Sequence, residues 1–399
     1  MTRIEMPRRR FGRTNLAMPV FSCGGMRYQH AWNDVPPGEI PADNQANLEA
    51  TIRRAVECGI NHIETARGYG TSEIQLGRIL PQFPRDELIV QTKIGPRDTG
   101  AEFLSVFETC LANLRLEHVD LLGIHGINNH EVLEQTLLPG GSLDTAERLK
   151  REGRVRHIGF STHGPVESTV RAIETGRFDY VNLHWYFVNE FTWPAIEAAT
   201  KQDMGVFIIS PNDKGGKLYE PSEKLLRLCA PLTPMQFNDL YCLSRPQVHT
   251  LSLGASRPTD FDEHVAGLAH YAGAGEVTAP IAARLHAEVA RVLGADWATR
   301  WHEGLPFWAD APGGINVHEI LRLWTWATAL DMESFAKMRY NLLGQGGHWF
   351  PGVNAEKAGD FDWFAALSRS PFADRIPGIL REAHERFFEA PKKRLSESD

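Results

Sequence analysis

The sequence lacks several features that would place it in other protein classes. No stretch approaches the ~20 consecutive apolar residues that a membrane-spanning helix requires. The segment 1–13 has no apolar central region, so we expect no secretory leader and a cytoplasmic location. The five cysteines are scattered and none lies in a CxxC pair, which argues against a disulfide framework or a zinc site. We therefore expect a soluble protein with no membrane partner and no metal.

An excess of positive charge is also lacking. The 399 residues include 42 Lys and Arg against 50 Asp and Glu, giving a net charge of -8. Nucleic-acid binding depends on concentrated basic side chains, so this balance argues against nucleic acid as a partner. The basic run PRRR at 7–10 is a local exception. We interpret it as a solvated N-terminus beside a first hairpin.

One pattern repeats from residue 18 to about 270: an apolar run, a polar turn and an amphipathic stretch. The apolar runs lie at 18–25, 60–65, 87–93, 119–125, 155–161, 178–184, 205–210 and 248–254. Helix-like stretches such as 44–59, 101–116 and 191–205 separate them. Eight alternating units predict an α/β fold, a (β/α)₈ TIM barrel over residues 1–272. The alternative, an open doubly wound sheet, usually begins with GxGxxG, whereas this turn reads CGGMRY.

The composition changes near residue 275. The Gly- and Ala-rich segment 272–280 is typical of a linker. Helical patterns at 281–294, 315–330 and 376–390 then predict a smaller, mainly helical C-terminal domain over residues 280–391. Six of the ten tryptophans lie between 297 and 349, and we expect them in its core. We expect the last residues, 392–399, to be a frayed tail.

Four titratable residues lie at the expected carboxyl ends of consecutive barrel strands, where barrel enzymes carry their active sites. Glu64 and Tyr69 follow the second strand, Lys93 ends the third and His125 ends the fourth. Each alone has an ordinary structural explanation. Their joint placement on one rim indicates a catalytic centre.

The motifs around these residues resemble the aldo-keto reductase family. The segment ETARGYGTSEIQLG at 64–77 is similar to the family motif DTAxxYGxSExxLG. Thr92-Lys93 resembles the family's catalytic lysine strand, and DLLGIH at 120–125 its DLxxxH strand. The resemblance implies hydride transfer between a nicotinamide and a carbonyl or alcohol.

The resemblance also implies a role for each catalytic residue. Tyr69 would donate the proton, and because a free tyrosine titrates near ~10, Lys93 would make that proton mobile. Glu64 would anchor Lys93, and His125 would orient the carbonyl oxygen. The family usually has Asp where this chain has Glu64, a departure that moves the carboxylate by one methylene.

The resemblance further implies a cofactor site along the remaining strand ends. Its expected members are Gly25, Met26, Ser161, Thr162, Asn182, Ser210, Pro211, Asn212, Lys214, Lys217, Gly254, Ser256, Arg257, Glu263 and His264. Ser161, Thr162 and Asn182 would hold the nicotinamide amide. Because Arg257 could bind a 2′-phosphate, we expect NADPH, with NADH as the alternative. Arg67 stands where the family motif is variable, and a cation at this rim would suit an anionic group of the substrate. The alternative is a solvated loop arginine or one that bridges to the C-terminal domain.

One branch of this family carries a C-terminal ferredoxin-like domain with the ligand run C-x₂-C-x₂-C-x₃-C-P. Aligned on Pro312 and Pro371, that spacing falls on Trp301, Gly304, Phe307, Ala311, Asp360, Trp363, Ala366 and Ser370. The C-terminal domain therefore resembles a degenerate ferredoxin domain in which tryptophans and Phe307 fill the vacated volume. Because no cysteine lies beyond Cys242, we expect no iron-sulfur cluster.

These observations predict an NADPH-dependent reductase acting on a small carbonyl or alcohol substrate. Two alternatives stay open. The chain could be an isomerase or epimerase that uses bound nicotinamide transiently, or a cofactor-binding regulator with weak turnover. A homo-oligomer is also compatible with the sequence.

Overall fold

The computed structural model describes residues 5–394. Its contacts divide the chain into two compact units. The first contains the residues up to 215 together with 238–275, and the second contains 216–237 together with the residues from 276 onward. The segment 216–237, which we had placed in the barrel domain, therefore groups with the C-terminal unit.

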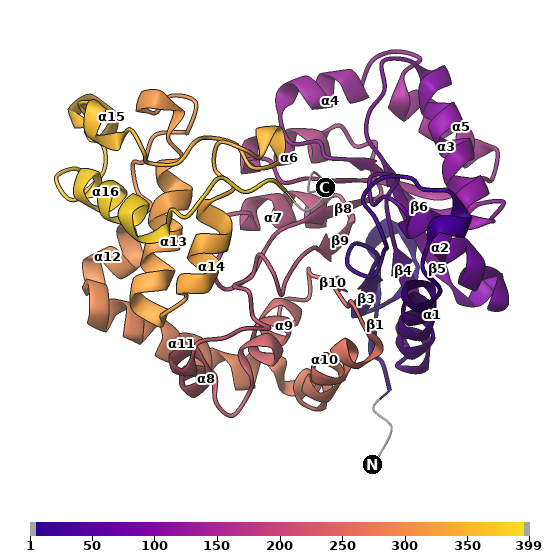
Figure 1. The fold of residues 1–399 in the computed structure, drawn as a ribbon, viewed down its shortest axis with the longest axis horizontal. Helices are drawn as coiled ribbons and strands as arrows, with labels where there is room; N and C mark the ends of the chain where they lie inside the picture. The colour runs from indigo at the N-terminus through magenta and orange to yellow at the C-terminus, as the bar shows by residue number, and fades with distance from the viewer. Residues whose placement is uncertain (1–4, 395–399) are drawn as a thin grey trace. The chain divides into compact units, whose positions relative to one another are not determined.

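The first unit is built on a closed barrel of eight parallel strands, which confirms the predicted fold class (Figure 1). The strands follow one another around the barrel in chain order, and β10 closes it against β3. They are β3 (Phe21–Gly24), β4 (His62–Glu64), β5 (Ile89–Ile94), β6 (Val119–His125), β7 (Val155–Ser161), β8 (Tyr180–Leu183), β9 (Gly205–Ile208) and β10 (Thr250–Leu253). Each lies within one of the eight predicted apolar runs or overlaps it.

Helices follow these strands along the chain, as the sequence pattern predicts. They are α1 (Ala42–Glu57), α2 (Ser72–Ile79), α3 (Gly100–Leu114), α4 (His130–Thr136), α5 (Ser142–Arg151), α6 (Val166–Glu174), α7 (Trp193–Lys201) and α10 (Asp262–Gly267). Helix α3 begins where it does because Thr99 and Glu102 form a reciprocal capping box at its first turn. Its apolar side chains, such as Phe103 and Phe107, are fully buried.

A short hairpin precedes the barrel, in which β1 (Arg8–Arg10) pairs antiparallel with β2 (Ala17–Pro19). The hairpin was predicted. The interpretation of this segment as solvated is wrong for Arg9. Its guanidinium donates to the carbonyls of Leu243 and Arg245 and to the hydroxyl of Tyr271. The basic run is therefore partly structural.

The second unit is helical, with α8 (Glu223–Cys229), α12 (Ala295–Arg300), α13 (Val317–Leu330), α14 (Glu333–Tyr340), α15 (Phe364–Leu367) and α16 (Ile376–Phe387). Helix α9 (Pro234–Leu243) and helix α11 (Ala274–Leu293) each have residues in both units. The predicted linker at 272–280 is wrong for most of its length, because α11 already begins at Ala274 and tolerates Pro280 inside it.

Tryptophans fill much of the core of the second unit. Trp297 is 1% exposed, packs edge-on against Trp324 at 5.4 Å and donates its ring N–H to Thr325. Trp301 and Trp363 are buried as well, as expected. Phe307 is 48% exposed, so the expectation that it fills the core is wrong.

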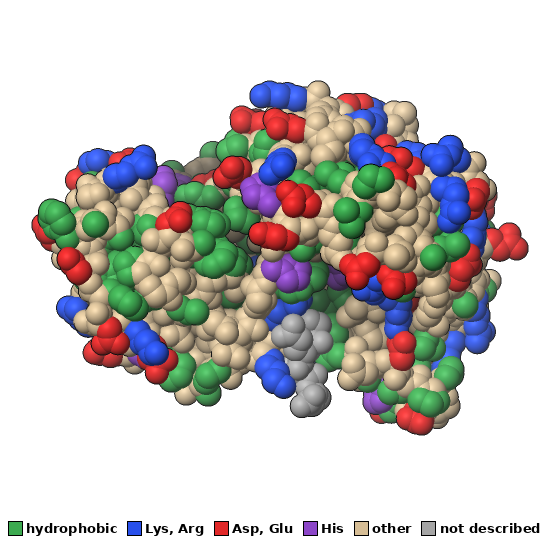
Figure 2. Space-filling model, turned by 90° about the horizontal axis from the view of Figure 1, so that it is seen from above, with side chains coloured by type: hydrophobic (Ala, Val, Ile, Leu, Met, Phe, Trp, Pro, Cys, Tyr) green, Lys and Arg blue, Asp and Glu red, His purple; other side chains and the backbone are tan. Residues whose placement is uncertain are grey.

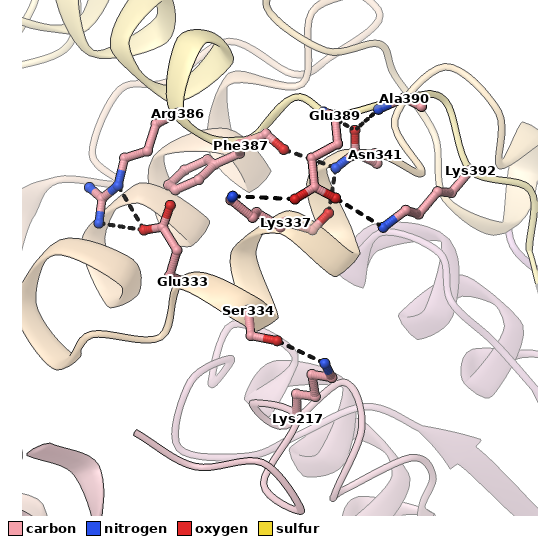
Figure 3. Close-up of polar contacts among 10 residues, drawn as sticks. All are labelled: Lys217, Glu333, Ser334, Lys337, Asn341, Arg386, Phe387, Glu389, Ala390 and Lys392. Carbon is pink, nitrogen blue, oxygen red and sulfur yellow. Dashed lines mark hydrogen bonds and ion pairs between the residues drawn. The ribbon is translucent and has the colours of Figure 1, made fainter. Parts of the chain in front are cut away.

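The chain after α16 is bound by several hydrogen bonds to Asn341. The amide oxygen of Asn341 accepts hydrogen bonds from the backbone of Glu389 and Ala390, and its amide nitrogen donates to the carbonyl of Phe387 (Figure 3). The backbone of Lys392 donates to the Asn341 carbonyl at 2.8 Å. The tail is therefore not frayed up to residue 394, and 395–399 lie outside the described residues.

Charged side chains of both signs are interspersed on the face of the molecule that Figure 2 shows. Within residues 5–394, no helix combines the length and the apolar character that crossing a bilayer demands.

Candidate active site

The four predicted catalytic residues come from neighbouring strand ends of the barrel. Glu64 is the last residue of β4, Lys93 lies near the end of β5, and His125 is the last residue of β6. Tyr69 stands in the loop between β4 and α2. Because β4, β5 and β6 are adjacent and parallel, these side chains share one rim.

Lys93 and Glu64 form a buried ion pair, and their side chains are only 2% and 4% exposed. The Lys93 ammonium also donates to the carbonyl of Thr65 at 2.8 Å. Burial holds the pKa of Lys93 well below its ordinary value. The second carboxylate oxygen of Glu64 accepts a hydrogen bond from the hydroxyl of Ser252. Ser252 belongs to none of the motifs, and the sequence did not predict this contact.

Tyr69 lies between the ammonium and the imidazole. The Lys93 Nζ is 4.8 Å from the centroid of the Tyr69 ring. The His125 ring meets the Tyr69 ring edge-on, with 5.8 Å between centroids. A phenol beside a cation and an imidazole is an arrangement that can hold and donate a proton.

The loop that carries Tyr69 is fixed by Arg67 and Gly70. The Arg67 guanidinium donates to Glu73, which is fully buried, at 2.8 Å and pairs with Asp34. Glu73 also accepts from the Thr92 hydroxyl at 2.7 Å, next to Lys93. Gly70 has φ +52° and a side chain there would meet the Ala31 carbonyl at 1.9 Å. The guanidinium expected to bind a substrate anion thus has two carboxylate partners within the protein.

The residues expected to hold the nicotinamide amide lie on β7 and β8. The Ser161 hydroxyl accepts from the backbone of Gly126 at 3.1 Å, and the Thr162 hydroxyl donates to the carbonyl of Ile127 at 2.7 Å. Asn182 is 0% exposed, and within residues 5–394 neither its amide oxygen nor its amide nitrogen has a hydrogen-bond partner. A buried carboxamide without partners costs free energy unless a ligand satisfies it.

The loop after β9 is tied to two other parts of the first unit. The Asn212 amide lies 3.1 Å from Nε2 of His264, whose Nδ1 pairs with Asp239. Both nitrogens of the buried His264 ring therefore face the protein, whereas the sequence suggested a cofactor contact. Burial opposes its charged form, but the Asp239 carboxylate outweighs that effect and raises the pKa of His264. Arg27 pairs with Asp213 at 2.7 Å, a bridge that no motif indicated.

The remaining expected cofactor residues are spread over several strand ends. Gly25 and Met26 follow β3, Ser210 and Pro211 follow β9, and Gly254 follows β10. Ser256 and Arg257 both bond to Asp260 at the start of a short 3-10 helix, and Glu263 lies in α10.

Arg257 is exposed and Lys217 belongs to the other unit. The Arg257 side chain is 72% exposed, so it is accessible to a ligand. The Lys217 ammonium contacts Glu220 at 2.5 Å. It also donates to the Ser334 hydroxyl at 2.7 Å (Figure 3).

Two histidines near the residues expected to hold the nicotinamide amide were not predicted from the sequence. His163 and His184 follow Ser161 and Asn182 by two residues each, and their nitrogens approach Lys214. Their position two residues beyond Ser161 and Asn182 was the signal that could have indicated them. Among the residues that the structure describes, no group of three His, Cys, Asp or Glu side chains is placed to hold a metal ion.

Comparison with known proteins identifies one family. The model of the aldo/keto reductase family matches residues 21–225. An L-galactose dehydrogenase from Arabidopsis thaliana is 31% identical over 170 residues, which cover 40% of this chain and 49% of that protein. An L-glyceraldehyde 3-phosphate reductase from Escherichia coli is 26% identical over 186 residues, covering 43% and 49%. The chain thus spans about half the length of these curated relatives.

Solved structures show the same fold. The crystal structure of an aldo-keto reductase from Klebsiella pneumoniae in complex with NADPH has a TM-score of 0.55 and 17% identity. The superposition covers 69% of this chain and 96% of that one. The family model spans more than half of the chain and includes β3 to β9 together with Glu64, Tyr69, Lys93 and His125. The chain therefore belongs to the aldo/keto reductase family.

Proposed function

We propose that this protein is an NADPH-dependent oxidoreductase that reduces a small carbonyl substrate or oxidises the corresponding alcohol. The observation that carries the proposal is the convergence of Tyr69, Lys93 and His125 on one rim, with Lys93 held by Glu64. Carbonyl reduction places negative charge on oxygen, and these groups are the ones that could stabilise and protonate it.

Each residue has a distinct part in this proposal. Tyr69 donates the proton to the carbonyl oxygen, and the nearby Lys93 ammonium favours loss of that proton. Glu64 and the Thr65 carbonyl fix the ammonium in place. His125, edge-on to the Tyr69 ring, orients the substrate oxygen by hydrogen bonding.

The cofactor proposal is supported by the orphaned carboxamide of Asn182. Its buried donor and acceptor match the acceptor and donor of a nicotinamide amide. When bound, the nicotinamide supplies the hydride. Ser161 and Thr162 lie on the neighbouring strand end, and the exposed Arg257 is suited to a 2′-phosphate, which favours NADPH over NADH.

A Tyr69→Phe variant tests this function. It should reduce turnover across a panel of aldehydes and ketones by about 10²–10⁴-fold, because only the proton donor is lost. NADPH affinity, measured by fluorescence titration, should stay within about twofold. Tyr219→Phe, at a tyrosine that is 43% exposed, is the control and should keep wild-type rates. Retention of more than a tenth of the wild-type rate in Tyr69→Phe would exclude Tyr69 as the donor.

We also propose that the residues from about 280 onward are a ferredoxin-like domain without an iron-sulfur cluster. Gly304, with φ +66°, approaches the backbone of Arg369 and Ser370 so closely that a side chain there would meet the Arg369 carbonyl at 2.1 Å. Positions 304 and 370 belong to the two different ligand runs, and their proximity supports the resemblance. Since clusters need thiolates and no cysteine lies beyond Cys242, anaerobically purified protein should contain no stoichiometric iron.

A further inference from the structure

The hydroxyl of Ser252 reaches Glu64 from two strands away. Ser252 lies on β10 and Glu64 ends β4, and β3 stands between these two strands in the barrel. The hydroxyl nevertheless donates to Oε2 of Glu64 at 3.3 Å, and both side chains are buried. Neighbouring strands are about 4.8 Å apart, so the contact crosses about twice that distance in the sheet. It requires a long side chain on one strand and open space on the strand between.

Gly24 provides that space on β3. It is the residue that pairs with Glu64 in the register of β3 and β4. A β-carbon at Gly24 would lie 2.6 Å from the hydroxyl oxygen of Ser252 and 3.3 Å from Oε2 of Glu64. The first distance is shorter than non-bonded atoms tolerate, so a side chain at this position would displace the hydroxyl. The contact therefore depends on the glycine.

The extra methylene of Glu64 provides the length. Its Oε1 pairs with the Lys93 ammonium while its Oε2 accepts from Ser252, so the carboxylate bridges β5 and β10. An aspartate would be shorter by one carbon–carbon bond, about 1.5 Å. Because the hydrogen bond to Ser252 is already long for a hydroxyl donor, an aspartate paired with Lys93 would not reach it. The contact is thus specific to the residue in which this chain departs from the family motif.

A second contact on the carboxylate has a physical purpose. Glutamate has one more rotatable side-chain bond than aspartate, and that bond must be fixed when the ion pair forms. A donor on Oε2 restricts this rotation and keeps Oε1 directed at Lys93, and hydrogen bonds to an ionised carboxylate are stronger than neutral ones. Because Lys93 Nζ lies 4.8 Å from the centroid of the Tyr69 ring, a loosely held Glu64 would also loosen the cation beside the phenol.

We propose that Ser252 is a positioning residue that holds the Glu64 carboxylate against Lys93, through the opening that Gly24 leaves in β3. The proposal rests on the proposed function, because the position of Lys93 affects turnover only if Tyr69 donates a proton. Gly24, Glu64 and Ser252 then act as one set. The glutamate is held by the hydroxyl, and the hydroxyl reaches the glutamate only past the glycine.

A double-mutant cycle between Glu64 and Ser252 tests the proposal. Ser252→Ala should lower kcat by about three- to tenfold, the effect of one hydrogen bond, with KM and NADPH affinity within about twofold. In the Glu64→Asp background the same substitution should change kcat by less than about 1.5-fold, since the shorter side chain does not reach the hydroxyl. An equal effect of Ser252→Ala in both backgrounds would overturn the proposal.

Ser22→Ala is the matched control. Ser22 pairs with Ser252 in the register of β3 and β10, and its buried hydroxyl contacts His62 at 2.6 Å and Thr250 at 2.7 Å. The variant also removes a buried hydroxyl from the barrel interior, so it should lower stability but keep kcat within about twofold in both backgrounds. If Ser22→Ala lowers kcat as much as Ser252→Ala does, the effect of Ser252 is a general one and the positioning role fails.

Gly24→Ala acts on the same contact without removing either polar group. The new methyl group should displace the Ser252 hydroxyl and lower kcat at least as much as Ser252→Ala does. Ser252→Ala added to Gly24→Ala should then cause no further loss, because the contact is already broken. A further loss as large as that of Ser252→Ala alone would contradict the part assigned to the glycine.

The free energies of unfolding of the same variants separate this proposal from the proposed function. Denaturant titration measures coupling between Glu64 and Ser252 without any turnover. If the wild-type protein reduces no carbonyl and the coupling is present, the proposed function fails and the contact serves stability alone. If the wild-type protein reduces carbonyls but kcat shows no coupling, only the positioning role of Ser252 is overturned.

Discussion

Each unit of this protein buries an ion pair, and the two pairs differ in origin. In the barrel, Lys93 and Glu64 come from different strands, 29 residues apart in the chain. In the second unit, Arg322 and Glu319 lie three residues apart on one helix, with two hydrogen bonds of 2.7 and 2.8 Å between them. The first pair adjoins Tyr69, and the second adjoins the Phe335 ring.

The difference shows that burial of charge alone does not indicate a catalytic site. Both pairs remove charges from water at considerable cost. The barrel pair fixes an ammonium beside a phenol at the rim where barrel enzymes react. The helical pair packs against the Phe335 ring, and its Glu319 also lies 3.8 Å from the guanidinium of Arg339. We therefore expect the first pair to control activity and the second to control stability.

The largest effect should come from Glu319→Gln in the second unit. Arg322 is 4% exposed on its side chain and cannot lose its proton, so the variant leaves a buried charge without its bidentate partner. We expect a loss of about 3–5 kcal/mol in the free energy of unfolding of that unit. Denaturant titration measures it, and turnover per folded molecule should change by less than twofold. A large fall in turnover with unchanged stability would reverse the comparison.

Glu64→Gln should have a smaller effect in free energy than Glu319→Gln, and this effect should be on activity. Unlike arginine, Lys93 can lose its proton, and burial already lowers its pKa. Removal of the Glu64 carboxylate should lower that pKa further, so the neutral amine replaces the ammonium at a lower pH. We expect turnover to fall by about 10²-fold, with the alkaline decline of the pH–rate profile moved to lower pH.

Glu64→Asp is the matched variant because it retains the charge and has the residue that the family usually carries. It should keep the alkaline limb of the profile near that of the wild type. If Glu64→Asp reduces simple aldehydes faster, the glutamate is a specialisation of this protein. An unchanged pH–rate profile in Glu64→Gln would remove Glu64 from the control of Lys93.

The barrel and its rim were predictable because they depend on local patterns. Eight apolar runs at regular spacing predict eight strands, and the strand ends at Glu64, Lys93 and His125 then fix the rim. The sequence could not reveal Ser252 as a partner of Glu64, because the contact joins strands 188 residues apart. For His163 and His184 the sequence offered only their spacing of two from Ser161 and Asn182, since their proximity depends on how β7 and β8 align.

The errors concern places where tertiary contacts override composition. Glycine and alanine at 272–280 suggested a linker, yet α11 begins at Ala274 because packing stabilises helices beyond their intrinsic propensity. The tail from residue 392 onward reads as polar and frayed, yet the backbone of Lys392 donates to the Asn341 carbonyl. The cofactor contact of His264 stays a prediction, and the structure adds that its ring pairs with Asp239 of another helix.

The smallest effect should come from Arg67, for which sequence and structure suggest different roles. The sequence favoured binding of a substrate anion. In the structure its guanidinium contacts the buried Glu73 and also Asp34, and its backbone N–H donates to the Lys93 carbonyl at 2.9 Å. Loss of these contacts should loosen the loop that positions Tyr69. We expect Arg67→Ala to lower kcat by about tenfold, because small displacements of a catalytic group are costly.

The substrate pair para-carboxybenzaldehyde and its methyl ester separates the two roles of Arg67. Positioning of Tyr69 predicts that kcat falls by the same factor for both aldehydes, with KM little changed. Arg53→Ala, at an exposed arginine on α1, is the control and should leave both constants near the wild type. A rise in KM restricted to the carboxylated aldehyde would instead establish Arg67 as an anion-binding residue. The order of the loop would then depend on its other contacts, among them the hydrogen bond from the Thr71 backbone to the Ala31 carbonyl at 3.0 Å and the close approach of Gly70 to Ala31.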